Sequence, residues 1–230
     1  MATLDASKTG RAFVFGKSSH AAARDATTAN GVAVDPSYST SQGMSYARAA
    51  GRSGNSFSIY RTFYYFDTSG ITGDVSSATL NILGASAETA TVKIVPSTAF
   101  GGDGSADIVV ADFNNITFDD SYSPSGFTGW DDGLNNSIIL RTAAANDIRD
   151  NDYFICAVIE YTYDYGDTDP GSTTTVQSGI NYVTAAYLDY TEAGASGPAN
   201  LTSFNNIAKA SITNINGITL ANITTLNGIS

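Results

Sequence analysis

Short runs of alternating apolar and polar side chains, which are typical of β-strands, begin near Ser56 and continue to about residue 190. In the first run, residues 57–66, large apolar side chains occupy both faces before turn residues at 67–70 end the strand. Further strands are expected at 78–83, 91–95, 107–111, 137–141, 153–163 and 183–190, with one helical turn near 143–149. The pattern predicts an all-β fold, a jelly-roll-like antiparallel β-sandwich over residues 56–193.

Residues 1–55 follow a different pattern, rich in Ala, Ser, Thr and Gly. Only residues 11–15 combine β-forming side chains with a glycine that ends a strand. Between residues 20 and 51 the large apolar side chains are few, chiefly Tyr38, Met44 and Tyr46, and they cannot bury enough surface for this segment to fold alone. We therefore expect an extended N-terminal arm with one strand, ordered by whatever surface it lies against.

The pattern changes again after residue 193. Small residues and a proline at 194–199 predict a flexible linker, and three copies of an eleven-residue unit follow it. Apolar side chains recur at the first, fourth and seventh positions of this unit: Leu201, Phe204, Ile207, Ile212, Ile215, Ile218, Ile223, Leu226 and Ile229. The second and third copies also contain Asn-Gly.

An eleven-residue period suits a right-handed helical supercoil, but glycine in a helix costs about 1 kcal/mol relative to alanine. Asn-Gly is instead a preferred two-residue β-turn, so we expect short β segments joined by these turns. Three such units leave an apolar side uncovered unless it packs on something. The flexible linker favours other chains, so residues 194–230 are expected to form an oligomerisation or docking tail, most naturally a homotrimeric fibre-like stem. The alternative is a tail packed on its own sandwich.

Charge is unevenly distributed along the chain, whose net charge is −11. Residues 1–61 hold seven Lys and Arg against three Asp, whereas residues 62–230 hold four against nineteen acidic side chains. The acidic body argues against nucleic acid as a partner. The basic region either faces an acidic neighbour, such as a second copy, or makes scattered solvent contacts. The sequence contains no run of about 18 apolar residues that would predict a membrane span. The first residues also lack the apolar stretch of a secretory signal, so we expect synthesis in the cytoplasm.

Few side chains offer catalytic chemistry. His20 is the only histidine, and Cys156, the only cysteine, lies in an apolar run where a buried inert thiol is expected. A Cys–His pair is therefore not expected, and no Gly-x-Ser-x-Gly nucleophile elbow is present. The sequence predicts a protein that is not an enzyme.

Two loops carry weaker binding signals. The first holds Asp164, Asp167 and Asp169, whose hard oxygen ligands suit Ca²⁺; the alternative is a solvated acidic loop. In the second, Trp130 together with Tyr122 and Phe127 could stack on a sugar ring, or could instead cap the core. No other cofactor is expected.

Residues 60–67 (YRTFYYFD) and 70–83 (GITGDVSSATLNIL) resemble the opening of DNRLRE-type jelly-roll domains, relatives of carbohydrate-binding modules. The whole layout, with an arm, a jelly-roll body and an Asn-Gly-Ile repeat, resembles structural proteins of tailed bacteriophages. This resemblance implies a non-enzymatic virion protein of the head-decoration, head-fibre or tail-fibre type. Its partners would be copies of itself and other virion proteins, contacted through arm and tail. The alternative is a non-catalytic carbohydrate-binding module of an adhesin or surface protein, with a host-surface glycan as its partner.

Overall fold

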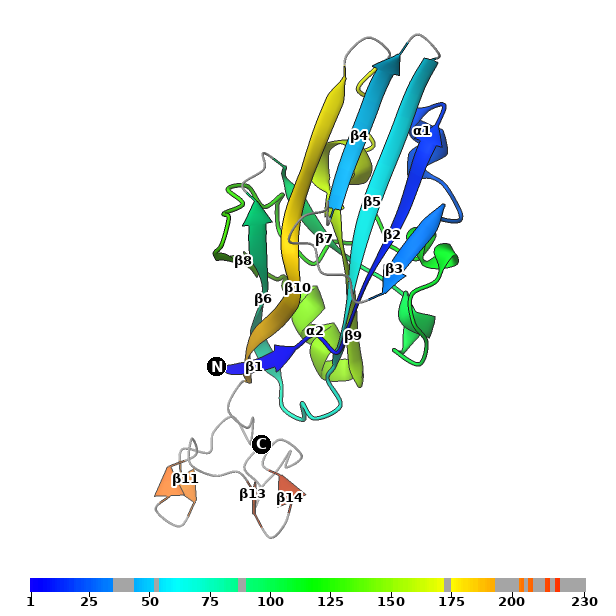
Figure 1. The fold of residues 1–230 in the computed structure, drawn as a ribbon. Helices are drawn as coiled ribbons and strands as arrows, with labels where there is room; N and C mark the ends of the chain where they lie inside the picture. Colours follow the sequence, from blue (N-terminus) through cyan, green and yellow to red (C-terminus); the bar gives the residue numbers. More distant parts are fainter. Residues whose placement is uncertain are drawn as a thin grey trace.

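The computed structural model describes residues 1–34, 44–51, 54–86, 90–171 and 175–192, together with residues 203–204, 207–208, 214–215 and 218–219. It confirms an all-β chain whose antiparallel sheets pack as a sandwich (Figure 1). The strands of the body are β1 (Ala2–Asp5), β2 (Lys8–Lys17), β3 (Gly31–Val34), β4 (Met44–Gly51), β5 (Gly54–Asp67), β6 (Val75–Ser86), β7 (Val92–Pro96), β8 (Asn135–Ile139), β9 (Tyr153–Glu160) and β10 (Val176–Glu192).

The helical elements of the body are short. They are α1 (His20–Arg24), α2 (Thr142–Asp150), the 3₁₀ turns η1 (Phe100–Gly102) and η2 (Val110–Asn114), and the π-helical turn η3 (Tyr161–Tyr165). In the part of the chain that the structure describes, no helix is both long and apolar enough to cross a lipid bilayer.

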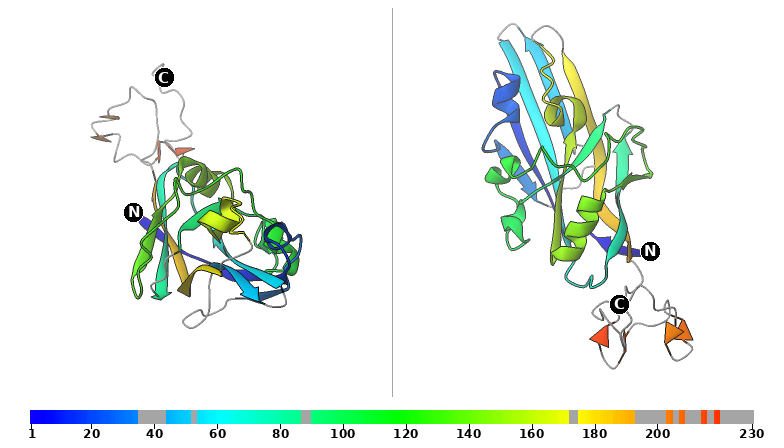
Figure 2. Two further views of the ribbon diagram at one scale, coloured as in Figure 1. Left: turned by 90° about the horizontal axis from the view of Figure 1, so that it is seen from above. Right: turned by 180° about the vertical axis from the view of Figure 1, so that it is seen from behind.

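Two long strands, β5 and β10, organise the body. Along one edge β5 pairs with β2, and along the other it pairs first with β4 and then with β9. Residues 176–180 of β10 pair with β4, and the rest of β10 pairs with β6 and β1. The strands therefore form one sheet where β4 lies between β5 and β10. Beyond β4 they separate into two layers, β3–β2–β5–β9–β7 and β1–β10–β6–β8 (Figures 1 and 2).

The first core fills the space between these layers. Tyr64 and Phe154 contribute to it from one layer, Leu80 and Leu188 from the other, and Ile148 of α2 closes it. All five side chains are fully buried. Their packing explains why α2 forms where it does, since the helix covers the gap between the two diverging layers with its apolar residues.

A second core covers the opposite face of β5 and β9. Successive residues of β9 alternate between the two cores, which is why this strand is apolar at nearly every position rather than at every second one. The segment 97–118 lies over this face with Phe100 and Phe113. Gly10 of β2 allows the close approach, because a Cβ atom at that position would lie 2.7 Å from the side chain of Ile108.

The N-terminal region is part of the sheet. Where the sequence predicted an arm with one strand, β1, β2, β3 and β4 all pair with strands of the body, and the predicted strand at 11–15 lies within β2. β4 consists largely of residues with weak strand propensity (Ala, Ser and Gly), so its pairing partners rather than its own side chains determine its conformation, and β3 is only four residues long. Residues 35–43 of the expected arm lie outside the described residues.

The other expected elements differ in two places. The strand expected at 107–111 is wrong, because the carboxylate of Asp112 accepts the N–H groups of Val109 and Phe100 and bends the chain into η2. The strand expected at 153–163 ends at Glu160, whose carboxylate caps η3. The helical turn expected near 143–149 is confirmed as α2.

Candidate functional site

The densest polar cluster of the body is centred on a buried ion pair. Arg61 lies on the second-core face of β5, between Ile59 and Phe63. Its Nε is 2.9 Å from Asp164 Oδ2 and its Nη2 is 2.6 Å from Asp164 Oδ1, and both side chains are 0% exposed. Two further N–H groups donate to the carbonyl oxygens of Phe113 and Arg24. This two-point contact is the geometry that makes an arginine–carboxylate pair strong.

The π-helical turn η3 aims Asp164 inward. Glu160 Oε2 accepts the N–H groups of Tyr163 and Asp164, and Glu160 Oε1 accepts the hydroxyl of Ser178. Burial raises the pKa of the Glu160 carboxyl, although these donors act in the opposite direction. Glu160 therefore fixes the turn that presents Asp164 to Arg61.

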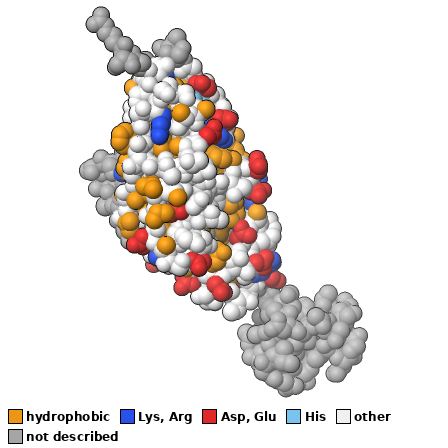
Figure 3. Space-filling view, turned by 90° about the vertical axis from the view of Figure 1, so that its right-hand side faces the viewer, with side chains coloured by type: hydrophobic (Ala, Val, Ile, Leu, Met, Phe, Trp, Pro, Cys, Tyr) orange, Lys and Arg blue, Asp and Glu red, His pale blue; other side chains and the backbone are white. Residues whose placement is uncertain are grey.

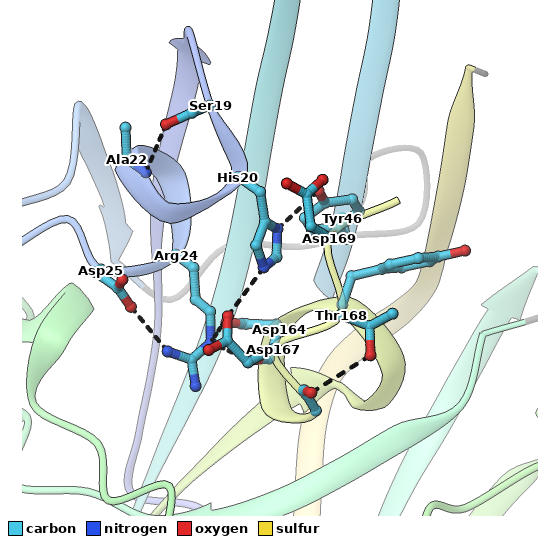
Figure 4. A network of polar contacts seen from close by, with 12 residues as sticks. Ser19, His20, Ala22, Arg24, Asp25, Tyr46, Asp164, Asp167, Thr168 and Asp169 are labelled. Carbon is cyan, nitrogen blue, oxygen red and sulfur yellow. Dashed lines mark hydrogen bonds and ion pairs between the residues drawn. The ribbon is translucent and has the colours of Figure 1, made fainter. Parts of the chain in front are cut away.

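His20 extends the cluster to α1 (Figure 4). Its Nδ1 lies 3.0 Å from the hydroxyl of Tyr46 and its Nε2 lies 3.1 Å from Asp167 Oδ1. Arg24 also reaches this loop, since its Nε donates to the carbonyl oxygen of Asp164. Burial, with the charge of Asp169 adding to it, raises the pKa of the Tyr46 hydroxyl, which stays protonated. With both ring nitrogens occupied and 4% of its surface exposed, His20 ties α1 to the loop after η3 and is not placed as a general base.

The three aspartates that suggested a calcium site do not converge. Asp164 is committed to Arg61, and Asp167 lies against His20 and Arg24. Asp169 accepts the N–H of Gly171 within its own loop. No group of three or more His, Cys, Asp and Glu side chains within the described ranges is arranged to hold a metal ion. The sequence pattern did not show that Arg61 forms an ion pair with Asp164, which prevents this carboxylate from joining the other two at a metal ion.

The aromatic residues expected to stack on a sugar are in the first core. Trp130 is 4% exposed and Tyr122 is 5% exposed, and the hydroxyl of Tyr122 donates to Asp147 of α2. Phe127 is partly buried and meets the Trp130 ring edge-on, with 6.4 Å between the centroids. Stacking on a sugar requires a solvent-exposed ring face, which the buried rings of Trp130 and Tyr122 lack, so the structure favours the alternative in which these rings cap the core. Cys156 is also buried, as expected, and burial raises the pKa of its thiol.

Acidic side chains are spread over the surface of the body (Figure 3). Four aspartates and two tyrosines line a hollow of about 500 Å³ at the ends of β5 and β9: Asp67, Asp103, Asp150, Asp152, Tyr65 and Tyr153. Three of these carboxylates accept hydrogen bonds from Ser69, Ser105 and Arg149, which lowers their pKa values. The carboxylates that line the hollow therefore face solvent, and three of them have a hydrogen-bond donor of their own.

The C-terminal repeat forms two small hairpins. β11 (Ser203–Phe204) pairs with β12 (Ile207–Ala208), and β13 (Asn214–Ile215) pairs with β14 (Ile218–Thr219). In both copies the fourth and seventh positions of the repeat are register partners, Phe204 with Ile207 and Ile215 with Ile218, so two residues connect each pair of strands. The expectation of short β segments in the repeat is confirmed for these residues, while the connecting residues 205–206 and 216–217 lie outside the described residues. The remaining apolar positions of the repeat, Leu201, Ile212, Ile223, Leu226 and Ile229, lie outside the described residues.

No protein-family model matches the chain, and a search of curated proteins finds no match.

Proposed function

We propose that this chain is a non-enzymatic structural protein of a tailed-bacteriophage virion, of the head-decoration, head-fibre or tail-fibre type. It assembles with copies of itself, and with other virion proteins, through the C-terminal repeat. The observation that carries the proposal is the register of the two hairpins, in which apolar positions of the repeat are paired across a two-residue connection. A hairpin with two-residue strands does not hold together alone in water, so it needs a partner surface.

The body supports this proposal as a rigid carrier. The polar side chains of the buried cluster, among them His20, Arg24 and Arg61, contact other groups of the body. The N-terminal strands β2 and β4 pair with β5 of the body, so assembly is assigned to the C-terminal tail and not to residues 1–55. A trimeric stem remains the most natural form, since three short repeats from one chain leave an apolar side to be covered by neighbours.

Removing the repeat tests the proposal. Full-length protein is expected to be oligomeric by light scattering and native mass spectrometry, and deletion of residues 197–230 is expected to leave a monomer. Point variants test the same idea. Ile215→Asn with Ile218→Asn is expected to weaken the oligomer, whereas the control, Thr213→Asn with Thr224→Asn at the polar second position of the repeat, is expected to leave it intact. An oligomeric mass that survives the deletion would show that the tail is not the assembly element.

A further inference from the structure

β8 is a free edge of its layer. Among the described strands it pairs with β6 alone, and the N–H of Leu140 just beyond it donates to the carbonyl oxygen of Ala78. Main-chain groups alternate between the two edges of an antiparallel strand. The N–H and C=O groups of Ser137 and Ile139 therefore point away from β6, where another strand can reach them.

A groove of about 330 Å³ runs along this edge. Its far wall is the segment 123–128, which is held to the other layer by the pairing of Phe127 with Val92. Arg141 closes one end of the groove. Its main-chain N–H donates to the carbonyl oxygen of Tyr122, and its guanidinium donates to the carbonyl oxygen of Pro124 over 2.9 Å. From Arg141 toward Ser137 the edge of β8 opens into the groove.

The edge carries an exposed apolar side chain and no charge. Ile139 is 69% exposed, the largest fraction among the large apolar side chains of the described residues after Met1. Free edges are usually protected by charged residues or proline, yet residues 134–139 read LNNSII. Apart from Arg141 at its end, the groove is lined by Ser, Thr, Gly, Pro, Phe and Ile, on a protein with a net charge of −11. These features suit the addition of an uncharged β-strand.

The C-terminal repeat has the matching chemistry. Residues 201–230 contain no acidic side chain and one basic one, Lys209. Its described strands form two sheets of their own, separate from the ten-stranded sheet. Among the described residues, the tail strands of one copy pair with each other and none pairs with β8, so the edge of β8 is open to a strand of another copy.

We propose that a repeat strand from a second copy of this chain adds to the free edge of β8. It would hydrogen-bond to the main chain of Ser137 and Ile139 and cover the Ile139 side chain. This inference rests on the proposed assembly function and specifies the surface that receives the tail.

Two full-length variants test the receiving surface. Ile139→Lys places a charge on the edge. Ser137→Pro removes one outward N–H and keeps the main-chain ladder to β6, although it also removes the hydrogen bond from the Ser137 hydroxyl to Asn81 of β6. Both are expected to raise the dissociation constant of the oligomer about tenfold or more, the equivalent of roughly 1.4 kcal/mol, with an unchanged far-ultraviolet circular dichroism spectrum. Val109→Lys is the matched control, since Val109 is 51% exposed, lies outside the groove and should leave the constant unchanged. If the tail deletion abolishes the oligomer while both β8 variants retain wild-type affinity, the receiving surface is wrong and the proposed function stands.

Photocrosslinking identifies the occupant. Benzoylphenylalanine replaces Ile139 in full-length protein, and unlabelled and ¹⁵N-labelled copies are mixed before irradiation. Mass spectrometry is expected to find crosslinks from position 139 to residues 201–230 of the other isotopic form, and none from the same probe at position 109. Crosslinks to the tail within one copy only, or to another part of the body, would overturn the inference.

Discussion

The buried pair of Arg61 and Asp164 provides the sharpest test of how the body is held together. Asp164→Asn keeps the size of the side chain but removes the charge that faces the guanidinium. Both partners are 0% exposed, so the arginine would stay buried without a counter-charge. Breaking such a pair by removing one partner costs about 3–5 kcal/mol, out of a total stability of about 5–15 kcal/mol for a typical domain.

Urea unfolding measures this loss. With an m-value of about 2–3 kcal/mol/M, the midpoint should fall by roughly 1–2.5 M while the slope stays the same. The control is Asp107→Asn at the pair between Lys8 and Asp107, where the atoms are 3.4 Å apart and the side chains are 30% and 69% exposed. An exposed pair of this kind contributes about 0–1 kcal/mol.

The double variant Arg61→Met with Asp164→Leu separates burial from pairing. It removes both charges and leaves apolar side chains beside Phe113, whose ring lies 4.0 Å from the arginine carbon in the native protein. Replacing a whole buried pair is often nearly neutral, but this variant also removes the donors to the carbonyl oxygens of Phe113 and Arg24, so part of the lost stability should return. If Asp164→Asn costs no more than Asp107→Asn, the pair is solvated and the reasoning from burial fails.

Further predictions follow from single side chains. Burial raises the pKa of Glu160 above its ordinary value of 4.5, so its stabilising effect is complete below that pH and is lost as pH rises through the raised value. Glu160→Gln should therefore flatten the decline of Tm on the alkaline side of pH 4.5, and an unchanged slope would contradict this. EDTA should leave Tm unaltered, because Asp164 is bound to Arg61; a lower Tm would restore the calcium site. Cys156 should react with thiol reagents only after unfolding, since it is buried with a raised thiol pKa. Iodide should hardly quench Trp130, the only tryptophan, until the protein unfolds; strong quenching in the native state would return this ring to the surface.

The pattern of apolar and polar residues predicted those strands whose conformation depends on neighbouring residues in the sequence. β5 and β9 were found because runs of apolar and aromatic residues bounded by turn residues are properties of neighbouring residues. The strand expected at 107–111 failed because one side chain, Asp112, offers the backbone better hydrogen bonds than a strand partner would. β4 was missed because its residues are mostly small and it is held by pairing with β5 and β10, and β3 because it has only four residues, which pair with β2.

The polar cluster could not be predicted from neighbours, since His20 and Asp167 are 147 residues apart and Arg61 and Asp164 are 103 apart. One signal was nevertheless present. Arg61 occupies the inward position of an alternating strand, between Ile59 and Phe63, and a charged side chain there requires a buried partner. The identity of that partner depends on the π-helical turn, which no local pattern indicates.

The path of β10 relates the rigid body to the proposed assembly role. The tail leaves the body after Glu192, at the end of a seventeen-residue strand that pairs with β4, β6 and β1. β1 pairs with residues 187–190 near the end of β10, where the hydroxyl of Thr3 donates a hydrogen bond to the carboxylate of Asp189. A pull along the tail is therefore opposed by many hydrogen bonds loaded together, and not by one end pair opened at a time. Because β10 contributes to both parts of the sheet, such a force would reach the whole sandwich, which suits the proposed tethering by the C-terminal repeat.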